Sequence, residues 1–234
     1  MDNSYQIYFN SPELREAIKT LRVNIEFAGI DEPVRSVAVT SVEAGVGKST
    51  IALSLAIAMA ETGKTTLIID NDFRNPQIAN RLMVRGVYSL TELFSGKVDP
   101  REACVPTKVN NLFMLDLGSR RLNNPIEVLS SGRYKALLAK VKQDFDFVVI
   151  DTPPLGLFID AAIASTQVDG VLMVISSGKS TAAEVKESLA QLEKANAHVI
   201  GCVLNNLKHK PADYYGYYYD KRGDKKRKKI RRKQ

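Results

Sequence analysis

A glycine-rich segment has the residue types that bind the phosphates of a nucleotide. Residues 44–50 read A-G-V-G-K-S-T, between a predicted strand at 35–41 and a predicted helix at 48–61. Such glycines let backbone N–H groups turn inward, and a helix N-terminus favours negative charge. The lysine reaches the β- and γ-phosphates, and the hydroxyl residue after it is a Mg²⁺ ligand. We therefore expect Mg-ATP to bind through Gly45, Val46, Gly47, Lys48, Ser49 and Thr50.

The loop departs from the usual G-x-x-x-x-G-K-[ST] pattern at one position, because Val42 stands where the first glycine is expected. A G-K-S-T tetrapeptide alone is a weak signal, and a helix N-terminus without a ligand is the alternative interpretation. The strand–loop–helix context, together with two acidic strand ends elsewhere in the chain, makes the nucleotide interpretation the stronger one.

Two other predicted strands end in carboxylates, in the segments L-I-I-D-N-D-F-R and F-V-V-I-D-T-P-P. Ligands of a doubly wound sheet bind at the carboxyl ends of strands, so Asp70, Asp72 and Asp151 should converge on the loop. Asp151 is at the position of a Walker B aspartate, and we expect Ser49, Asp70 and Asp151 to hold Mg²⁺. Asp70 and Asp72 are two residues apart and would share one face of an extended chain. Turn chemistry explains a single aspartate at a strand end, but not three beside a phosphate loop.

The rest of the chain alternates β-branched runs with helical patterns, which is typical of a parallel sheet covered by helices. The runs are almost continuously apolar, as expected when both faces of a sheet are buried. We predict an α/β fold: a P-loop NTPase-type, doubly wound, mostly parallel sheet flanked by helices. The predicted strands are 35–41, 65–70, 111–117, 146–151, 170–176 and 198–204, and the predicted helices are 12–28, 48–61, 125–143, 158–167 and 180–196.

The net charge of +7 is concentrated at one end of the chain. Residues 220–234 contain ten Lys or Arg and two Asp, so that the other 219 residues sum to −1. We therefore predict a near-neutral domain at 1–210 and a flexible tail at 211–234, whose composition cannot form a core. This distribution argues against a nucleic-acid groove in the domain and suits a tail that contacts an anionic membrane surface, nucleic acid or an acidic partner. Two distant cysteines without a CxxC motif fit a reducing cytosol.

Together the loop, the D-N-D-F-R segment and the D-T-P-P segment resemble the bacterial tyrosine kinases. These are P-loop autokinases that regulate capsule and exopolysaccharide synthesis. The resemblance runs from Ser11-Pro12 to the tyrosine-rich end. It is to the Gram-positive arrangement, in which the cytoplasmic kinase is separate from its membrane activator.

The resemblance implies transfer of the γ-phosphate of ATP to tyrosines of the tail. In this mechanism Lys48 and the loop amides stabilise the phosphates, Asp151 holds the metal, and Asp70 or Asp72 orients or deprotonates the phenol. The five candidate acceptors lie within six residues and are Tyr214, Tyr215, Tyr217, Tyr218 and Tyr219. The alternative interpretation of this cluster is an aggregation-prone aromatic segment or one that stacks on single-stranded RNA.

The resemblance also implies partners and further site residues. The partners are a transmembrane activator, a homo-oligomeric ring and a cognate tyrosine phosphatase, with recruitment of the cytoplasmic kinase to the inner face of the plasma membrane. Glu16, Lys19 and Arg22 have the spacing of the family's oligomerisation motif Glu-x-x-Arg-x-x-Arg, although a solvated helix face would look the same. Arg74 is assigned to the nucleotide site. Asn205 is at the position where related ATPases contact adenine, and it could equally be a turn residue.

A rival interpretation is an ATP-switched assembly or localisation ATPase that is tethered through its basic tail. Septum-placing and plasmid-partitioning ATPases carry a second lysine early in the loop, where this sequence has Glu43. The rival also leaves the tyrosine cluster without a role. The sequence therefore favours the tyrosine kinase.

Overall fold

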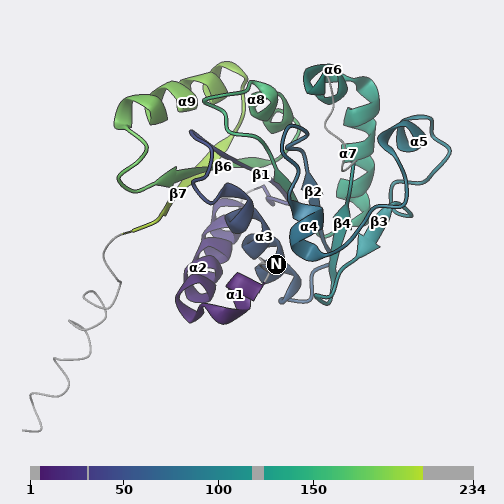
Figure 1. Ribbon diagram of the computed structural model, residues 1–234, viewed down its shortest axis with the longest axis horizontal. Coiled ribbons are helices and arrows are strands. Elements are labelled where there is room, and N and C mark those ends of the chain that lie inside the picture. The colour runs from purple at the N-terminus through teal and green to yellow at the C-terminus, as the bar shows by residue number, and fades with distance from the viewer. Residues whose placement is uncertain (1–5, 31, 118–123, 208–234) are drawn as a thin grey trace, which may run out of the picture.

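The computed structural model describes residues 6–30, 32–117 and 124–207. It confirms the predicted fold class: a seven-stranded sheet lies between two layers of helices (Figure 1). The strands are β1 (Ser36–Ser41), β2 (Thr66–Asp70), β3 (Cys104–Pro106), β4 (Leu112–Leu115), β5 (Phe147–Asp151), β6 (Gly170–Ser176) and β7 (Val199–Asn205). The helices are α1 (Gln6–Asn10), α2 (Pro12–Ala28), α3 (Lys48–Ala60), α4 (Ile78–Leu82), α5 (Leu90–Phe94), α6 (Pro125–Ser130), α7 (Gly132–Asp144), α8 (Asp160–Ser165) and α9 (Ala182–Lys194).

The strand order is β3-β4-β2-β5-β1-β6-β7. All neighbouring pairs are parallel except β3 with β4, which is antiparallel at the edge of the sheet. The carboxyl ends of β1, β2 and β5 therefore meet at the same edge. In the β2–β5 pairing Asp70 lies directly opposite Asp151, which brings two acidic strand ends together.

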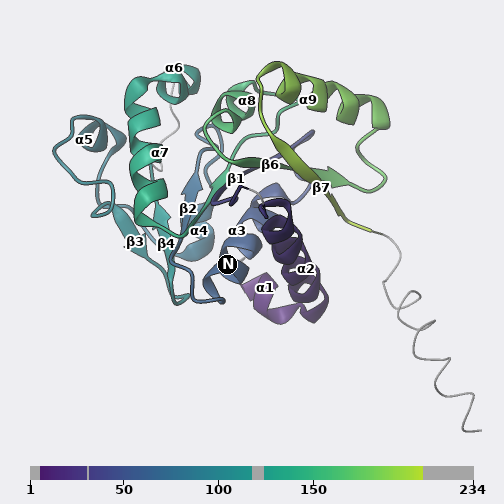
Figure 2. The same ribbon diagram turned by 180° about the vertical axis from the view of Figure 1, so that it is seen from behind.

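Both faces of the sheet are covered, as the apolar strands predict. Helices α2 and α3 lie on one face, and α7, α8 and α9 lie on the other (Figures 1 and 2). Alternate residues of one strand contribute to the two cores: Ile68 packs in the α3 core, whereas Leu67 and Ile69 pack in the α7 core. This alternation explains why the strands are apolar without interruption.

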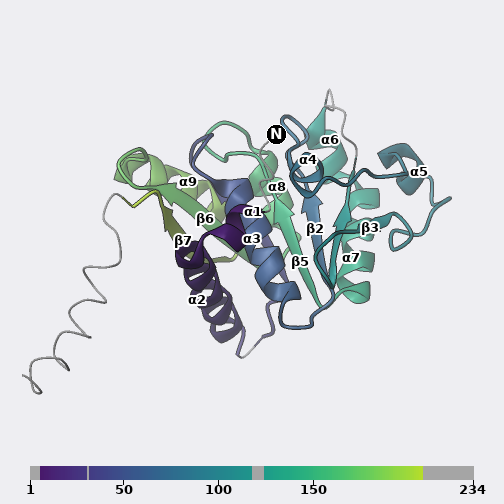
Figure 3. The ribbon, with the colours of Figure 1, turned by 60° about the horizontal axis from the view of Figure 1, so that its bottom comes forward.

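Helix α3 is the central helix of its layer, with α2 packed against it (Figure 3). Every residue from 51 to 60 is buried, because α3 lies between the sheet and α2. A helix that is apolar on all sides is stable only when it is covered in this way. No helix in the described part of the chain is both long enough and apolar enough to cross a membrane.

The prediction of one continuous helix at 125–143 is wrong. The chain forms two helices there, because Ser131 is extended, with φ −72° and ψ 147°, between α6 and α7. The Ser131 Oγ accepts a hydrogen bond from the Tyr134 N–H at 3.1 Å and so caps α7. A serine before a glycine within the apolar pattern was the available indication of this break.

The sequence prediction also omitted the short elements between β2 and β4. Helix α5 begins at a capping box in which Ser89 and Glu92 exchange hydrogen bonds. Helix α4 has no such local signature, and its N-terminus is held instead by Asp70 of β2. This long-range cap matters because α4 forms one wall of the functional site.

Candidate functional site

The glycine-rich loop connects β1 to α3, and its two glycines have backbone conformations that other residues rarely adopt. Gly45 has φ +72° and Gly47 has φ +93°. A Cβ atom on Gly47 would also lie only 2.3 Å from the Nδ2 atom of Asn205. The sequence assigned these glycines to phosphate binding, and the structure shows that the shape of the loop itself requires them.

The carbonyl groups of the loop are held from outside by side chains distant in sequence. Lys179 Nζ donates to the Ala44 carbonyl at 2.8 Å, and Asn205 Nδ2 donates to the Val46 carbonyl at 2.8 Å. Lys179 also lies 3.5 Å from the Glu43 carboxylate. A loop whose carbonyls are engaged on the outside presents N–H groups to the inside, which is the arrangement that binds anions. We call Lys179 and Asn205 the outer contacts of the loop.

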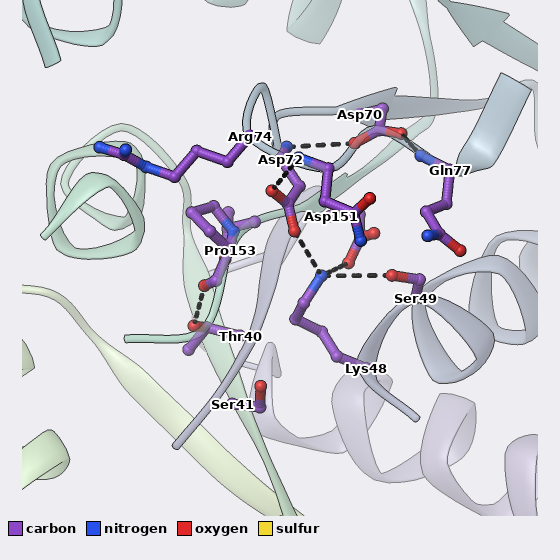
Figure 4. A network of polar contacts seen from close by, with 12 residues as sticks. Thr40, Ser41, Lys48, Ser49, Asp70, Asp72, Arg74, Gln77, Asp151 and Pro153 are labelled. Carbon is purple, nitrogen blue, oxygen red and sulfur yellow. Dashed lines mark hydrogen bonds and ion pairs between the residues drawn. The ribbon is translucent and has the colours of Figure 1, made fainter. Parts of the chain in front are cut away.

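Lys48 begins α3 and points toward the ends of β2 and β5 (Figure 4). Its Nζ lies 2.7 Å from Asp151 Oδ1, 3.2 Å from Ser49 Oγ and 3.8 Å from Asp72 Oδ2. Lys48 is only 7% exposed. The structure therefore brings a buried ammonium, two carboxylates and the predicted metal-binding hydroxyl into one cluster.

Asp151 supplies the observation that tests whether Mg²⁺ fits this site. It is 1% exposed at the end of β5, and its Oδ2 atom is buried without a hydrogen-bond partner among the described residues. Such an orphaned carboxylate oxygen beside Ser49 suits a hydrated cation. No group of three or more His, Cys, Asp or Glu in the described ranges could hold a metal ion. Mg²⁺ uses one or two protein ligands together with water and phosphate oxygens, so Asp151 and Ser49 suffice as candidate protein ligands.

Asp70 is engaged by backbone donors and fixes the position of α4. Its Oδ2 atom accepts from the N–H groups of Gln77 at 2.7 Å and Ile78 at 2.9 Å, and Oδ1 accepts from Asp72 N–H at 3.1 Å. Burial, and secondarily the charge of Asp151, raises the pKa of the Asp70 carboxyl to about 7. Asp70 therefore has a structural task in addition to the metal-binding and catalytic role predicted for it.

Asp72 lies beyond the end of β2 and has different neighbours. Its Oδ1 atom accepts from Asn75 N–H at 3.0 Å, while Oδ2 faces Lys48. Burial raises the pKa of the Asp72 carboxyl above its ordinary value. Strand β2 ends at Asp70, and the expectation that Asp70 and Asp72 share one face of an extended chain stays a prediction. Of the two carboxylates, Asp72 is the one that lines the cavity.

A cavity of about 380 Å³ opens over this cluster. Its walls come from the glycine-rich loop, the segment after β2, α4 and the segment after β5. Its size is within the range of small-molecule sites. Among the described residues, three cationic side chains line it, namely Lys48, Arg74 and Arg81.

Arg74 points away from Lys48 (Figure 4). Its guanidinium donates to both carboxylate oxygens of Asp160, at 2.7 and 3.3 Å, and lies 4.1 Å from the centre of the Phe158 ring. Asp160 is 1% exposed at the start of α8, so this pair ties the segment after β2 to the segment after β5. The nucleotide contact predicted for Arg74 stays a prediction.

Comparison with known proteins gives the family. The ParA family model, described as NUBPL iron-transfer P-loop NTPase, matches residues 33–229. Tyrosine-protein kinase CpsD of Streptococcus agalactiae is 35% identical over 224 residues, covering 92% of this chain and 96% of that protein. Tyrosine-protein kinase YwqD of Bacillus subtilis (strain 168) is 36% identical over 206 residues, covering 87% and 85%. The solved structure of the chimerical protein CapA2B2 has a TM-score of 0.80 and 31% identity, covering 89% of this chain and 92% of that one. The chain belongs to the bacterial tyrosine-protein kinases.

The family confirms the resemblance predicted from the loop and the two acidic segments, and it makes the chain a phosphotransferase that acts on protein tyrosine. The P-loop NTPase model agrees with the sheet order and with the loop before α3. Iron transfer belongs to the description of that model and is not carried over to the kinase.

The outer contacts of the kinase give a testable expectation for the loop. Lys179→Met and Asn205→Ala should each weaken Mg-ADP binding about 2- to 12-fold, because each leaves a loop carbonyl without its donor and the loop less preorganised. Titration calorimetry measures this change, and Lys186→Met on the exposed side of α9 is the control.

The same titrations separate the two roles of Asn205. If it also reads adenine, Asn205→Ala should reduce the preference for ADP over GDP, whereas Lys179→Met should leave that preference unchanged. Wild-type affinity in both variants would contradict the role given to the outer contacts.

The predicted oligomerisation residues all lie on α2 of the kinase. Glu16 pairs with Lys19 at 2.7 Å, and Arg22 pairs with Glu26 at 3.1 Å. The Glu16 side chain is 72% exposed and that of Arg22 is 22% exposed. Their role in a ring stays a prediction. The tail tyrosines and the basic block lie outside the described residues.

Three residues of this region were not singled out from the sequence: Arg81, Asp160 and Lys179. Lys179 had a visible signal, since residues 178–181 repeat the G-K-S-T tetrapeptide of residues 47–50. Arg81 lies four residues after Gln77, and that helical spacing places the two side chains together. Asp160 had no signal beyond its position after a strand.

Proposed function

We propose that this kinase transfers the γ-phosphate of Mg-ATP to tyrosines of its own tail. The observation that carries the proposal is the buried cluster in which Lys48 contacts Asp151 and lies near Asp72, beneath a loop already shaped for phosphates. The family supplies protein tyrosine as the acceptor class. The acceptors proposed are Tyr214, Tyr215, Tyr217, Tyr218 and Tyr219.

Each residue of the cluster has a task in the transfer. The ammonium of Lys48 and the loop amides bind the phosphate oxygens, and Ser49 and Asp151 would hold Mg²⁺. When bound, Mg²⁺ neutralises charge that develops on the phosphates. Asp72 accepts the phenol proton while the tyrosine oxygen forms a bond to the γ-phosphorus and the bond to the β-phosphate oxygen breaks. The raised pKa of Asp72 makes it a better proton acceptor than an ordinary carboxylate.

The biological setting is proposed from the resemblance. The relatives named CpsD and YwqD align with 92% and 87% of this chain, and both are named tyrosine-protein kinases. A chimerical protein, CapA2B2, among the structural relatives is in keeping with a kinase that works with a second polypeptide. We place the kinase in the cytoplasm beside a transmembrane activator, regulating capsular or exopolysaccharide synthesis, with a phosphatase reversing the modification.

Assembly and membrane contact belong to the same proposal. A ring formed through α2 would bring the tail of one subunit to the cavity of its neighbour. The tail carries a net charge of +8 within residues 220–234, which suits an anionic leaflet. Pelleting with anionic vesicles at two salt concentrations, with and without residues 221–234, measures this contact.

The proposed acceptors can be tested directly. Changing all five tail tyrosines to Phe should remove most of the phosphotyrosine formed with Mg-ATP and a candidate activator segment, because Phe keeps the ring but offers no hydroxyl. Immunoblotting and mass spectrometry measure the product. Mg-ADP affinity, which should not change, is the control for folding.

Two results would count against the proposal. Phosphotyrosine at the wild-type level in the five-fold Phe variant would show that the acceptor is not one of the five tail tyrosines. ATP hydrolysis without phosphotyrosine in the wild type would favour the localisation ATPase.

A further inference from the structure

Arg81 is a cation in the cavity that the phosphotransfer mechanism has not used. It lies in the last turn of α4 and is half-buried among the residues that line the cavity. Its Nη1 atom donates to the hydroxyl of Thr50 at 2.8 Å, and Nη2 donates to Gln77 Oε1 at 3.4 Å. Both partners are neutral. Within the described ranges Arg81 makes no ion pair with a carboxylate.

The other two cations of the cavity are already neutralised. Lys48 is paired with Asp151, and Arg74 is paired with Asp160 through two hydrogen bonds. Arg81 therefore carries the positive charge of this cavity that has no compensating carboxylate. A half-buried guanidinium with only neutral partners gains from an anion, because a bidentate guanidinium–phosphate pair adds charge attraction to two parallel hydrogen bonds.

The fold fixes Arg81 close to the phosphate loop. Asp70 caps the start of α4 through Gln77 and Ile78, which anchors this five-residue helix to the end of β2. The contact with Thr50 then holds the guanidinium against the first turn of α3. That turn also contains Lys48 and Ser49.

We propose that Arg81 binds the phosphate chain of the nucleotide. A guanidinium presents a planar fork of N–H groups that matches two phosphate oxygens, and an ammonium cannot copy this geometry. The proposal rests on nucleotide binding at this cavity and not on the identity of the phosphate acceptor. It gives α4 a function, since the helix delivers a permanent charge to the first turn of α3, which also contains Lys48.

The test compares Arg81→Gln and Arg81→Lys with a matched control. Arg85→Gln removes an arginine four residues away that is exposed and does not line the cavity. We expect Arg81→Gln to weaken both Mg-ADP and Mg-ATP binding by about 10- to 100-fold in titration calorimetry. Arg81→Lys should fall between Gln and wild type, and Arg85→Gln should stay within about twofold of wild type.

Two further readouts separate phosphate binding from a purely structural tie between α4 and α3. The affinity of Arg81→Gln for Mg-ADP should depend less on salt than that of the wild type, because one charge contact is missing. A structural tie predicts lower stability of the ligand-free variant with unchanged affinity and salt dependence, and that result overturns the proposal. If Arg81→Gln does not fold, an Arg81→Lys variant that binds Mg-ADP with wild-type affinity also overturns the proposal.

The outcomes also distinguish this proposal from the autokinase. A wild-type chain that binds Mg-ADP but forms no phosphotyrosine would contradict the autokinase and leave the role of Arg81 standing. A wild type that forms phosphotyrosine, together with an Arg81→Gln variant that binds nucleotide as tightly as the wild type, would contradict the role of Arg81 and leave the autokinase proposal standing.

Discussion

Lys48→Met should lower the rate of tyrosine phosphorylation by at least about a hundredfold, because it removes the charged donor that stabilises the phosphates during transfer. The same change should make the ligand-free protein less stable by about 3–5 kcal/mol. The second effect follows from the structure, since Lys48 is the 2.7 Å partner of an Asp151 carboxylate that is 1% exposed. Methionine leaves that charge buried and unpaired.

A double variant separates the two effects. Lys48→Met combined with Asp151→Asn removes both charges, so most of the stability lost in the single variant should return while activity stays absent. Urea unfolding without nucleotide gives the stability, and an anti-phosphotyrosine assay with Mg-ATP gives the activity. Lys140→Met, which breaks the part-buried pair with Asp144 within α7, far from the cluster around Lys48, is the control and should change both quantities much less.

The change in melting temperature on addition of Mg-ADP is a third measurement that can be made on the same variants. Mg-ADP should raise the melting temperature of the wild type and of Lys140→Met, because the ligand binds only the folded state. Mg-ADP should raise the melting temperature of Lys48→Met much less. Phosphotyrosine at the wild-type level in Lys48→Met would show that the loop is not the site of transfer, and unchanged stability would show that the Lys48–Asp151 pair contributes little.

The sheet and the loop could be predicted because their signals are local. Each central strand is a short β-branched run, and the loop has its glycines, lysine and serine within residues 45–49. Asp70 and Asp151 could be placed at the same edge because parallel strands align their carboxyl ends, and the register confirms that they face each other.

The division of labour between Asp70 and Asp72 could not be predicted. It depends on where β2 ends and on which N–H groups α4 directs at Asp70. The contacts of Lys179 and Asn205 with the loop span 135 and 159 residues of sequence, so no local pattern reports them.

The repeated G-K-S-T tetrapeptide shows the same limit. At 47–50 it opens α3, beside the buried carboxylate of Asp151. At 178–181 it precedes α9, whose N-terminus is already satisfied by a capping box between Thr181 and Glu184. The second lysine therefore supports the first loop from outside. Tertiary context, and not the four letters, decides which tetrapeptide lies at the cavity.

Asp72→Asn should lower kcat for tyrosine phosphorylation by about 10²- to 10⁴-fold while Mg-ADP affinity changes little, because it removes the proton acceptor and keeps the shape. Asp72 lines the cavity and lies 3.8 Å from Lys48. Steady-state kinetics with an acceptor peptide, together with titration calorimetry, measure the two quantities. A kcat within a few-fold of wild type would assign the phenol proton to another group.

Asp70→Asn is the matched comparison, and its main effect should be on stability and on the pH dependence of stability. The pKa of Asp70 is raised to about 7 in the folded protein, above its ordinary value of 3.8. Between these values the folded state keeps a proton that the unfolded state has released. Stability should therefore fall as the pH rises from about 4 to about 7, with a slope of up to about 1.4 kcal/mol per pH unit from this group.

Asp70→Asn should remove most of that slope when unfolding is measured without Mg²⁺ or nucleotide. Asp72→Asn should keep the part of the pH slope of stability that comes from Asp70, because the Asp70 cap on α4 is intact in that variant. If Asp70→Asn keeps the wild-type slope, the carboxyl is charged throughout this range and acts as an ordinary ionised cap. If instead Asp70→Asn lowers kcat as much as Asp72→Asn does with α4 still ordered, Asp70 takes part in the transfer itself.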